Sequence, residues 1–463
     1  MTIKSKKSFP PIVWIVLGLA IIFGSRFFFK TAKNVKLELP KIERGLRENA
    51  GDISWGKKAL IADNLNPQKR QGIAAYSKHD YQQAIEYWQA SLENNPNDPE
   101  TLIYLNNAQI GDCHAYSLAV SVPIGADSDT AQEILRGVAQ AQQEINLQGG
   151  INGVSLKIAI ADDNNDPQVA QKLAEDLSNN SEILGVIGHF SSDVTLAAAA
   201  VYESKGLVAI SPTSTSVSLS NAGEYIFRTV PSDRFAGSAL AKHLLESLNK
   251  QNAAVFYNSE SNYSNSLKDA FSTDLVSNGG RVVSEIDLSD ADFDVNSAIE
   301  LANKNGAEAL VLLATSSTLN KALSVTKNNQ QQLPLLAGDD VYTAKTLQTA
   351  GADTVGMVVA IPWHIRAAID SDYPETATRL WKAEVNWRSA LAYDATQALI
   401  QGLDSEPTRQ GIQTTLSASQ FSVIGASGEI NFLPSGDRNQ KPQLVEVRSG
   451  NNSGFGYDFV PVD

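Results

Sequence analysis

From Ala115 onward the chain alternates short apolar runs with amphipathic stretches, and this alternation limits the possible folds more than any other feature. "AYSLAVSV" (115–122) has the composition of a strand, and the next stretch (130–146) has apolar residues at 3- and 4-residue spacing, typical of a helix. Another strand-like run, "SLKIAIAD" (155–162), precedes a helical stretch opened by Asp166-Pro167, and "ILGVIG" (183–188) follows. Strands and helices in strict alternation predict an α/β fold, with parallel strands covered by helices on both faces.

The alternation begins again after "FRTVPSD", which ends at Asp233. Two successive series predict two α/β lobes. Long helical stretches after residue 372 indicate that the chain passes between the lobes more than once. We assign the first lobe to about 115–232 and 363–420, and the second to about 233–362 and 421–463. Two such lobes enclose a cleft, and open α/β sheets bind ligands beyond the carboxyl ends of their strands.

Net charge and cysteine content narrow the function classes. A formal net charge of −14 argues against binding nucleic acid through bulk electrostatics. The single cysteine, Cys113, excludes an intrachain disulfide and a multi-thiolate metal site. Small molecules, proteins and a membrane contacted by a dedicated segment remain as partners.

The N-terminal segment has the composition of a membrane anchor. The stretch from Phe9 to Ser25 contains no charged residue. Its length is close to the minimum that a helix needs to cross a bilayer. A cleavable signal peptide is the alternative, but its apolar region is usually shorter and no small-x-small cleavage motif follows. Basic residues flank both sides, so the positive-inside rule does not set the orientation. We therefore predict a transmembrane anchor over residues 1–30 and a linker over 31–68.

Residues 69–112 have a helical pattern. Gly72, Ala84, Trp88 and Pro96 occupy the small, small, aromatic and proline positions of a tetratricopeptide repeat at the right mutual spacing. One repeat cannot bury its own faces, so it must lean on the neighbouring domain or on a partner protein. Both a helical spacer and a docking module for a protein partner are consistent with the sequence.

Two turns after first-lobe strands are rich in hydroxyl groups. "GHFSSDVT" contains Ser192 and leads into a helix, and "SPTSTS" (211–216) follows the next strand. A helix N-terminus with adjacent hydroxyls suits an anion, and the absence of a glycine-rich phosphate loop favours a carboxylate. The alternative is structural: Ser192 caps its helix, and the serines of "SPTSTS" form a turn.

The second series supplies acidic side chains at comparable positions. Asp233 lies at the apparent crossover, and Asp339 and Asp340 follow a strand in "LLAGDDVY". Such acids can hold an ammonium group, although each is also a plausible helix cap or solvated loop residue. Tyr263 lies at a strand-to-helix turn and either covers a ligand or packs on the surface.

The sequence does not support an enzyme. A serine hydrolase elbow requires Gly-x-Ser-x-Gly, and no second glycine follows the serines beside His189. The other histidines have no zinc-like spacing. We expect neither catalysis nor a cofactor, and we expect His189 to have a packing role.

Several motifs, in order and at matching spacing, resemble the periplasmic branched-chain amino-acid-binding proteins of ABC transporters. They include "ILGVIGHFSSDVTLAAAAVYESKGLVAISPTSTS", "YIFRTVPSD", "LLAGDDVY" and "GEINFLPSGDR". The likeness covers about Ser117 to Asp437. It implies a periplasmic-binding fold of type I: a two-lobed clamp with three crossovers that closes around an amino acid.

The resemblance also implies roles for particular residues. When the family's residues are matched to this sequence motif by motif, each takes a role toward the carboxylate, the ammonium group or the side chain of a bound amino acid. Ser192 and Thr215 would bind the carboxylate, Thr213 and Ser214 would face the ligand, Thr215, Asp233 and Asp340 would serve the ammonium group, Tyr263 would lie at the mouth, and Phe190 would line the side-chain pocket.

Departures from the family pattern concern the pocket. The family often has an aromatic residue in its first strand-to-helix loop, but the aligned position here is near Thr130. A second family aromatic, after the strand-like run "EALVLLA", is replaced by Thr315-Ser316. Two cysteines that are bridged in some relatives are Asn165 and Ser191 here. These changes predict a more polar and roomier pocket than one built for leucine.

We therefore predict a membrane-anchored, extracytoplasmic solute-binding protein that delivers an amino acid or similar small zwitterion to an ABC transporter permease. The resemblance places the large domain outside the cytoplasm. The alternative is a membrane-anchored sensor or assembly module that signals ligand binding to a partner protein.

Overall fold

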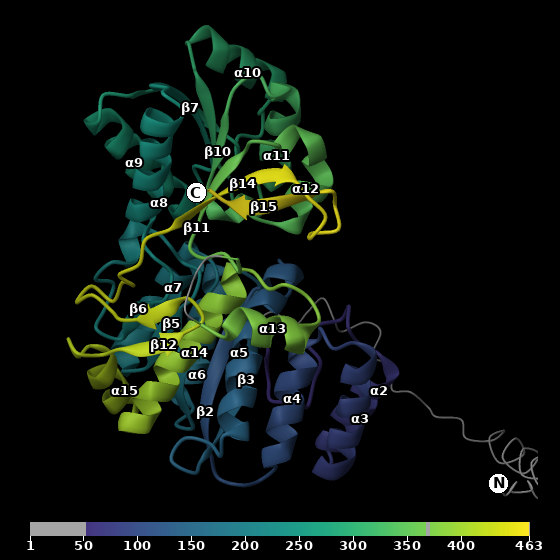
Figure 1. Cartoon of the computed structure of the whole chain (residues 1–463). Helices are drawn as coiled ribbons and strands as arrows, with labels where there is room; N and C mark the ends of the chain where they lie inside the picture. Colours follow the sequence, from purple (N-terminus) through teal and green to yellow (C-terminus); the bar gives the residue numbers. More distant parts are fainter. Residues whose placement is uncertain (1–51, 367–370, 463) are drawn as a thin grey trace, which may run out of the picture. The chain divides into compact units, whose positions relative to one another are not determined.

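The computed structural model describes residues 52–366 and 371–462, which belong to one compact unit, Arg47–Asp463. Two β-sheets organise this unit, each with helices on its faces (Figure 1). The first sheet has the strand order β1-β3-β2-β4-β5-β6. Its strands are β1 (Ile53–Ser54), β3 (Ser155–Asp162), β2 (Ala115–Val122), β4 (Ile183–Ile187), β5 (Val208–Ser211) and β6 (Ile226–Arg228).

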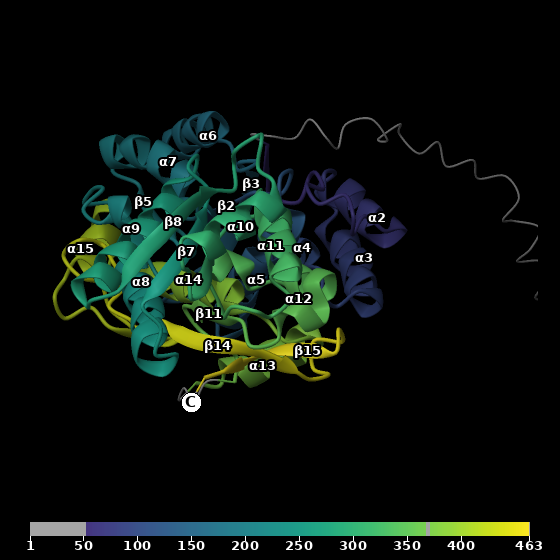
Figure 2. The same ribbon diagram turned by 90° about the horizontal axis from the view of Figure 1, so that it is seen from above.

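The second sheet has the strand order β15-β14-β11-β10-β9-β7-β8. Its strands are β15 (Tyr457–Pro461), β14 (Gln443–Ser449), β11 (Val358–Ile361), β10 (Leu335–Ala337), β9 (Ala309–Leu313), β7 (Asn252–Tyr257) and β8 (Arg281–Asp287). Pairing is parallel in both sheets except for β1, β14 and β15. The α/β prediction is confirmed, and the antiparallel β14 and β15 extend one edge of the second sheet (Figure 2).

The helices connect and cover these strands. The first-lobe helices are α5 (Ser128–Leu147), α6 (Pro167–Asn179), α7 (Ser192–Lys205), α13 (Tyr373–Trp381), α14 (Trp387–Ser405) and α15 (Arg409–Leu416). The second-lobe helices are α8 (Asp233–Lys242), α9 (Asn262–Ser277), α10 (Val295–Lys304), α11 (Leu319–Asn329) and α12 (Ala344–Ala350). Asp166 caps α6 as predicted, because its carboxylate accepts from the backbone N–H groups of Gln168 and Val169.

Both sheets share a topology in which the strand order reverses once. In the first lobe the chain winds outward from β2 to β3 and then from β4 to β6, and the second lobe repeats this from β7. The reversal lies between β2 and β4 and between β7 and β9. Crevices beyond the carboxyl ends of strands at such points are the sites where α/β sheets bind ligands.

The chain crosses between the lobes three times, and one predicted boundary is wrong. The crossovers follow β6, β11 and β13. Strands β12 (Val423–Gly425) and β13 (Gly428–Ile430) pair with each other, and β12 packs on α14. Arg438 forms a buried ion pair with Asp394 of α14 at 2.9 Å. Residues 421–438 therefore belong to the first lobe rather than the second.

Helices α2 (Pro67–Tyr76), α3 (Tyr81–Asn94) and α4 (Pro99–Ile110) form the predicted helical segment. Gly72 lies against the Trp88 indole: a Cβ atom on Gly72 would stand 2.3 Å from Nε1. Helix α4 packs against α5 and β3, and the Asn107 amide bonds to both the N–H and C=O of Ile158. The segment thus leans on the neighbouring domain. Its relation to tetratricopeptide repeats stays a prediction.

The predicted linker is wrong from Asp52 onward. Strand β1 pairs antiparallel with β3, and Leu60 and Ile61 are buried. Their N–H groups donate to the carboxylate of Glu100, which also pairs with the buried Lys69 Nζ at 2.7 Å. This part of the chain is therefore folded onto the first lobe. Residues 31–51 of the predicted linker lie outside the described residues.

None of the described helices combines the length and apolar character that crossing a bilayer requires. The predicted anchor, residues 1–30, lies outside the described residues.

Candidate functional site

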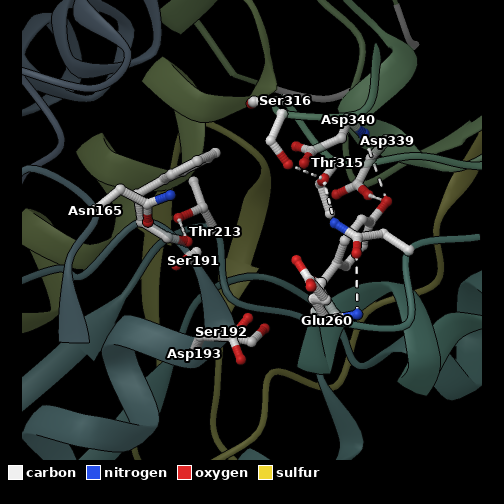
Figure 3. A pocket seen from close by; sticks show the side chains of 15 residues that line it. Asn165, Ser191, Ser192, Asp193, Thr213, Glu260, Thr315, Ser316, Asp339 and Asp340 are labelled. Atoms are coloured by element: carbon white, nitrogen blue, oxygen red, sulfur yellow. Dashed lines mark hydrogen bonds between the residues drawn. The ribbon is translucent and has the colours of Figure 1, made fainter. Parts of the chain in front are cut away.

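A cavity of about 230 Å³ lies between the two lobes, beyond the carboxyl ends of the strands (Figure 3). The first lobe contributes the turns after β3, β4 and β5, and the second contributes the turns after β7, β9 and β10. These are the turns on either side of the two topological reversals. The lining residues are Asn165, Phe190, Ser191, Ser192, Asp193, Thr213, Asn258, Glu260, Ser261, Tyr263, Thr315, Ser316, Ser317, Asp339 and Asp340.

The N-terminus of α7 forms one wall. Ser191, not Ser192, is the N-cap, and its hydroxyl accepts from the backbone N–H of Val194. Ser192 is the first helical residue and lines the cavity, and its Oγ accepts from the N–H of Ser216 at 3.2 Å. The structural alternative that Ser192 caps the helix is therefore wrong. Free N–H groups of the first turn and two hydroxyls are available to an anion here.

The "SPTSTS" turn contributes less to the cavity than predicted. Thr213 lines it, with its hydroxyl donating to the carbonyl of Phe190 at 2.7 Å. Ser214 is buried and donates to the same carbonyl at 3.0 Å, and Thr215 is buried with a hydroxyl that has no partner. Neither Ser214 nor Thr215 is among the lining residues. The Ser214 hydroxyl therefore joins this turn to the one after β4.

His189 lies behind this wall and not in the cavity. Its Nδ1 is 2.7 Å from Asp163 Oδ2, and its Nε2 is 3.0 Å from the Tyr202 hydroxyl. The imidazole is fully buried. Because both ring nitrogens already have partners other than a serine, no serine–histidine relay exists at this turn. The packing role predicted for His189 agrees with this arrangement.

The opposite wall carries two adjacent acids. Asp339 and Asp340 lie in the single turn that follows β10. The Tyr263 hydroxyl donates to Asp339 Oδ1 at 2.5 Å, and Arg388 Nη2 donates to Asp340 Oδ1 at 3.0 Å. Both acids line the cavity. The resemblance implied Asp340, together with Asp233 and Thr215, for the ammonium group. In the structure Asp340 already pairs with a cation, Arg388, and Asp339 does not.

Burial and mutual repulsion perturb these carboxyl groups. Burial, and next the charge of Asp340, raise the pKa of Asp339 to about 7. Burial also raises the pKa of Asp340, and the neighbouring Arg388 opposes that rise. A ligand cation would favour the ionised form of Asp339 and relieve this repulsion. The wall is thus suited to an ammonium group.

Asp233 begins α8 and is not among the residues that line the cavity. It is buried, and its N–H donates to the carbonyl of Thr215 at 2.9 Å. Burial raises its pKa to about 6; the nearby Ser266 and Thr215 hydroxyls oppose this, although Oδ2 has no hydrogen-bond partner. The position of Asp233 therefore does not favour direct contact with a ligand.

The remaining lining residues are polar and were not predicted as ligand-binding residues. Asn258 donates to the Thr315 hydroxyl at 3.0 Å, and Asp193 accepts from the N–H of Asn262 across the two lobes. For some of them the signal was present in the sequence, because Asn258 lies in the same turn as Tyr263 and Asp193 in the same turn as Ser192. No ligand-binding residue was predicted in the turns after β3 and β9. The lining residues include four acids, Asp193, Glu260, Asp339 and Asp340, and no basic residue.

Two lobes of the same doubly wound topology, with a polar cavity between equivalent turns, define a clamp that binds a small solute. The family model described as "Periplasmic binding protein" matches residues 119–452. The chain belongs to this family. Its members are non-enzymatic solute receptors, as predicted, and relatives that bind branched-chain amino acids support the predicted branched-chain amino-acid-binding group.

Curated relatives cover part of the chain. An amino acid binding protein of Pseudomonas aeruginosa is 28% identical over 228 residues, or 49% of this chain and 61% of the relative. The leucine-specific-binding protein of Salmonella typhimurium is 27% identical over 245 residues, or 53% of this chain and 65% of the relative. The chain thus spans slightly under two thirds of the length of these relatives.

Among solved structures, a leucine-binding protein from Thermotoga maritima superimposes with a TM-score of 0.65 at 21% identity. The match covers 74% of this chain and 97% of the other. This likeness establishes the two-lobed periplasmic-binding fold of type I.

Proposed function

We propose that this protein captures an amino acid or a similar small zwitterion between its lobes and delivers it to an ABC transporter. The observation that carries the proposal is the polarity of the cavity. Its first-lobe wall offers a helix N-terminus and serine hydroxyls, and its second-lobe wall offers two acids. A carboxylate and an ammonium group of one small molecule satisfy the two walls together.

The lining also favours a polar ligand side chain. Thr315, Ser316 and Asn258 form a hydroxyl- and amide-bearing surface beside the acids, and Asn165 faces them from the first lobe (Figure 3). These groups bond to protein partners, as in the contact of Asn258 with Thr315, but an aliphatic ligand side chain would displace water from them without adding a hydrogen bond, which costs free energy. We therefore propose a small polar amino acid in preference to leucine. Phe190 provides the apolar contact for the aliphatic part of the ligand.

The first test is a thermal-shift screen of the purified chain. Amino acids are compared with carboxylates that lack an ammonium group and with amines that lack a carboxylate. Ligand at 100 times its dissociation constant stabilises a single-site receptor by about 2.7 kcal/mol. We expect the shift only with molecules that carry both groups. Equal shifts with simple carboxylates would contradict the assignment of the acidic wall.

Variants assign the two ends of the ligand. Ser192→Ala and Asp339→Asn should each weaken binding of the best hit at least tenfold in isothermal titration calorimetry. Ser204→Ala, on the exposed part of the same helix as Ser192, is the matched control and should bind normally. Unchanged affinity in both site variants would locate the ligand elsewhere.

The proposal also includes a membrane anchor: residues 1–30 hold the chain in the membrane, with the large domain outside the cytoplasm. The uncharged stretch Phe9–Ser25 supports it. The full chain should fractionate with membranes and keep its N-terminus, as checked by N-terminal sequencing. A mature product that begins near Lys30 would contradict the anchor. Co-purification with a permease supports delivery, whereas co-purification with a kinase in its place would favour the sensor function.

A further inference from the structure

Arg388 reaches the cavity wall from the other lobe. It lies at the start of α14, which packs against α5 in the first lobe, whereas Asp340 belongs to the second lobe. Arg388 Nη2 donates to Asp340 Oδ1 at 3.0 Å, and Nη1 donates to the carbonyl of Tyr342 at 3.4 Å. Both contacts of the guanidinium with the second lobe thus go to one turn. The ion pair therefore joins the two lobes.

The surroundings hold this guanidinium in place. The Arg388 side chain is 3% exposed, and its guanidinium carbon lies 4.3 Å from the centre of the Trp387 ring. Its Nε atom is buried and has no hydrogen-bond partner. A buried arginine remains charged, so Asp340 is its compensating anion. The pair is therefore part of the folded clamp and not a mobile surface contact.

The neighbouring acid has no such cation. Asp339 accepts a hydrogen bond from Tyr263 at 2.5 Å, and no ion pair to Asp339 exists among the described residues. The wall thus holds two carboxylates and one protein cation. Of the other two acids of the lining, Glu260 is exposed, and Asp193 is half-buried and accepts from the N–H of Asn262. Solvent and salt screen such charges, so they attract a second ligand cation only weakly.

We infer that Arg388 is the specificity-determining residue for ligand charge: it neutralises Asp340 from across the cleft and leaves Asp339 for a single ligand ammonium group. This inference rests on the proposed amino-acid site and names a residue outside the cavity lining that decides its charge preference. Removing the arginine charge would expose a second carboxylate to the ligand. The site would then favour a molecule with two ammonium groups.

The test compares two probes of similar size, L-homoserine and L-2,4-diaminobutyrate. Homoserine has a hydroxyl at the end of its side chain, where diaminobutyrate has a second ammonium group. Dissociation constants are measured by calorimetry for the wild-type chain and for Arg388→Met. We expect the ratio of the two affinities to shift at least tenfold toward diaminobutyrate in Arg388→Met. Arg366→Met removes one positive charge from an exposed pair with Glu384 and should leave the ratio unchanged.

The double variant Arg388→Met/Asp340→Asn separates charge from structural damage. It again leaves one carboxylate, so its affinity ratio should return to the wild-type value, which a merely disrupted site would not do. Asp340→Asn alone leaves Arg388 without its anion beside Asp339, so both probes should bind at least tenfold more weakly. This variant tests the inference even if Arg388→Met does not fold.

An unchanged ratio in folded Arg388→Met, no return of the ratio in the double variant, or wild-type affinity in Asp340→Asn would overturn the inference. If neither probe nor any other amino acid binds to the wild-type chain or to any variant, the proposed function itself fails, and the inference fails with it. A ligand screen that succeeds while the ratio stays constant rejects the role of Arg388 alone.

Discussion

Asp339 changes its protonation state near neutral pH, because its pKa is raised to about 7. Its pKa of about 7 in the folded protein contrasts with an ordinary value of about 4 in the unfolded chain. Between these two values the folded state holds more protons than the unfolded state. The free energy of unfolding of the ligand-free protein therefore decreases as the pH rises through this window. Asp233, with a pKa of about 6, acts in the same direction.

Ligand binding should have the opposite pH dependence. An ammonium group binds the ionised form of Asp339, so protons compete with the ligand below pH 7. We expect affinity to fall by about tenfold per pH unit between pH 7 and pH 5, because one proton must leave. Calorimetry over this range checks the slope. Asp339→Asn should flatten the profile, whereas Asp269→Asn, with an exposed side chain, should not. A pH-independent affinity would exclude Asp339 as the ammonium site.

Ser192 has a structural contact in addition to its position in the cavity. Its hydroxyl is the acceptor for the buried N–H of Ser216. Ser192→Ala leaves that N–H without a partner, which costs about 1–3 kcal/mol of stability. Chemical denaturation of the ligand-free variant measures this loss. Ser192→Thr keeps a hydroxyl and should recover part of the stability, and an unchanged stability of Ser192→Ala would show that water replaces the contact.

At the scale of elements, close helix crossings position both walls of the cavity. Gly137 of α5 lies under α14, where an added Cβ would stand 2.0 Å from the carbonyl oxygen of Ser389. Gly237 makes a similar approach between α8 and α9, since its Cβ would lie 2.6 Å from the N–H nitrogen of Phe271. Both contacts are with backbone atoms, which cannot move away by a side-chain rotation. The start of α14, including Arg388, depends on the first of them.

Gly137→Ala should therefore force α5 and α14 apart. We expect a loss of about 1–3 kcal/mol in the free energy of unfolding, the usual cost of overpacking, measured by denaturant titration. Gly402→Ala is the matched control on α14. Its nearest neighbours would be a methyl group of Ile412 at 3.0 Å and the Cα atom of the same residue at 3.3 Å, both farther away than the carbonyl oxygen that Gly137 approaches. Similar losses in both variants would show that backbone crowding is not the cause.

The elements show how far the sequence could predict the site. Regular alternation predicted both sheets and the turns after β4, β5, β7 and β10, because apolar periodicity follows from burial. It did not predict which of Asp339 and Asp340 is free for a ligand. That choice depends on Arg388, which is 48 residues away along the chain and lies in another lobe. Long-range pairing of this kind has no local pattern.

On the scale of the whole molecule, residues 52–114 are part of the first lobe. The sequence indicated a linker up to residue 68 because two strand residues are too few to produce a periodic pattern. Helix α4 is buried on nearly all sides, against α5 and β3. Removing residues 52–112 would expose apolar surface and leave the N–H and C=O of Ile158 without Asn107.

A fragment that begins at residue 115 should therefore be much less stable than one that begins at residue 52. We expect a loss of several kcal/mol, since burial of each large apolar side chain contributes about 1.5–3 kcal/mol. Thermal unfolding and limited proteolysis of the two fragments, side by side, measure the difference. Equal melting temperatures would show that the helical segment is an independent module.

The pairing of β1 with β3 has a mechanical consequence. Any tension on residues before Asp52 reaches the folded unit through a strand of two residues, and then through the backbone of Leu60 and Ile61 held by Glu100. The charged cluster of Lys69, Asp98 and Glu100 behind them is fully buried. A pull from a tethered N-terminus would peel off β1 first and then meet this cluster. The load would end there, before it reached the segments that cross between the lobes after β6, β11 and β13.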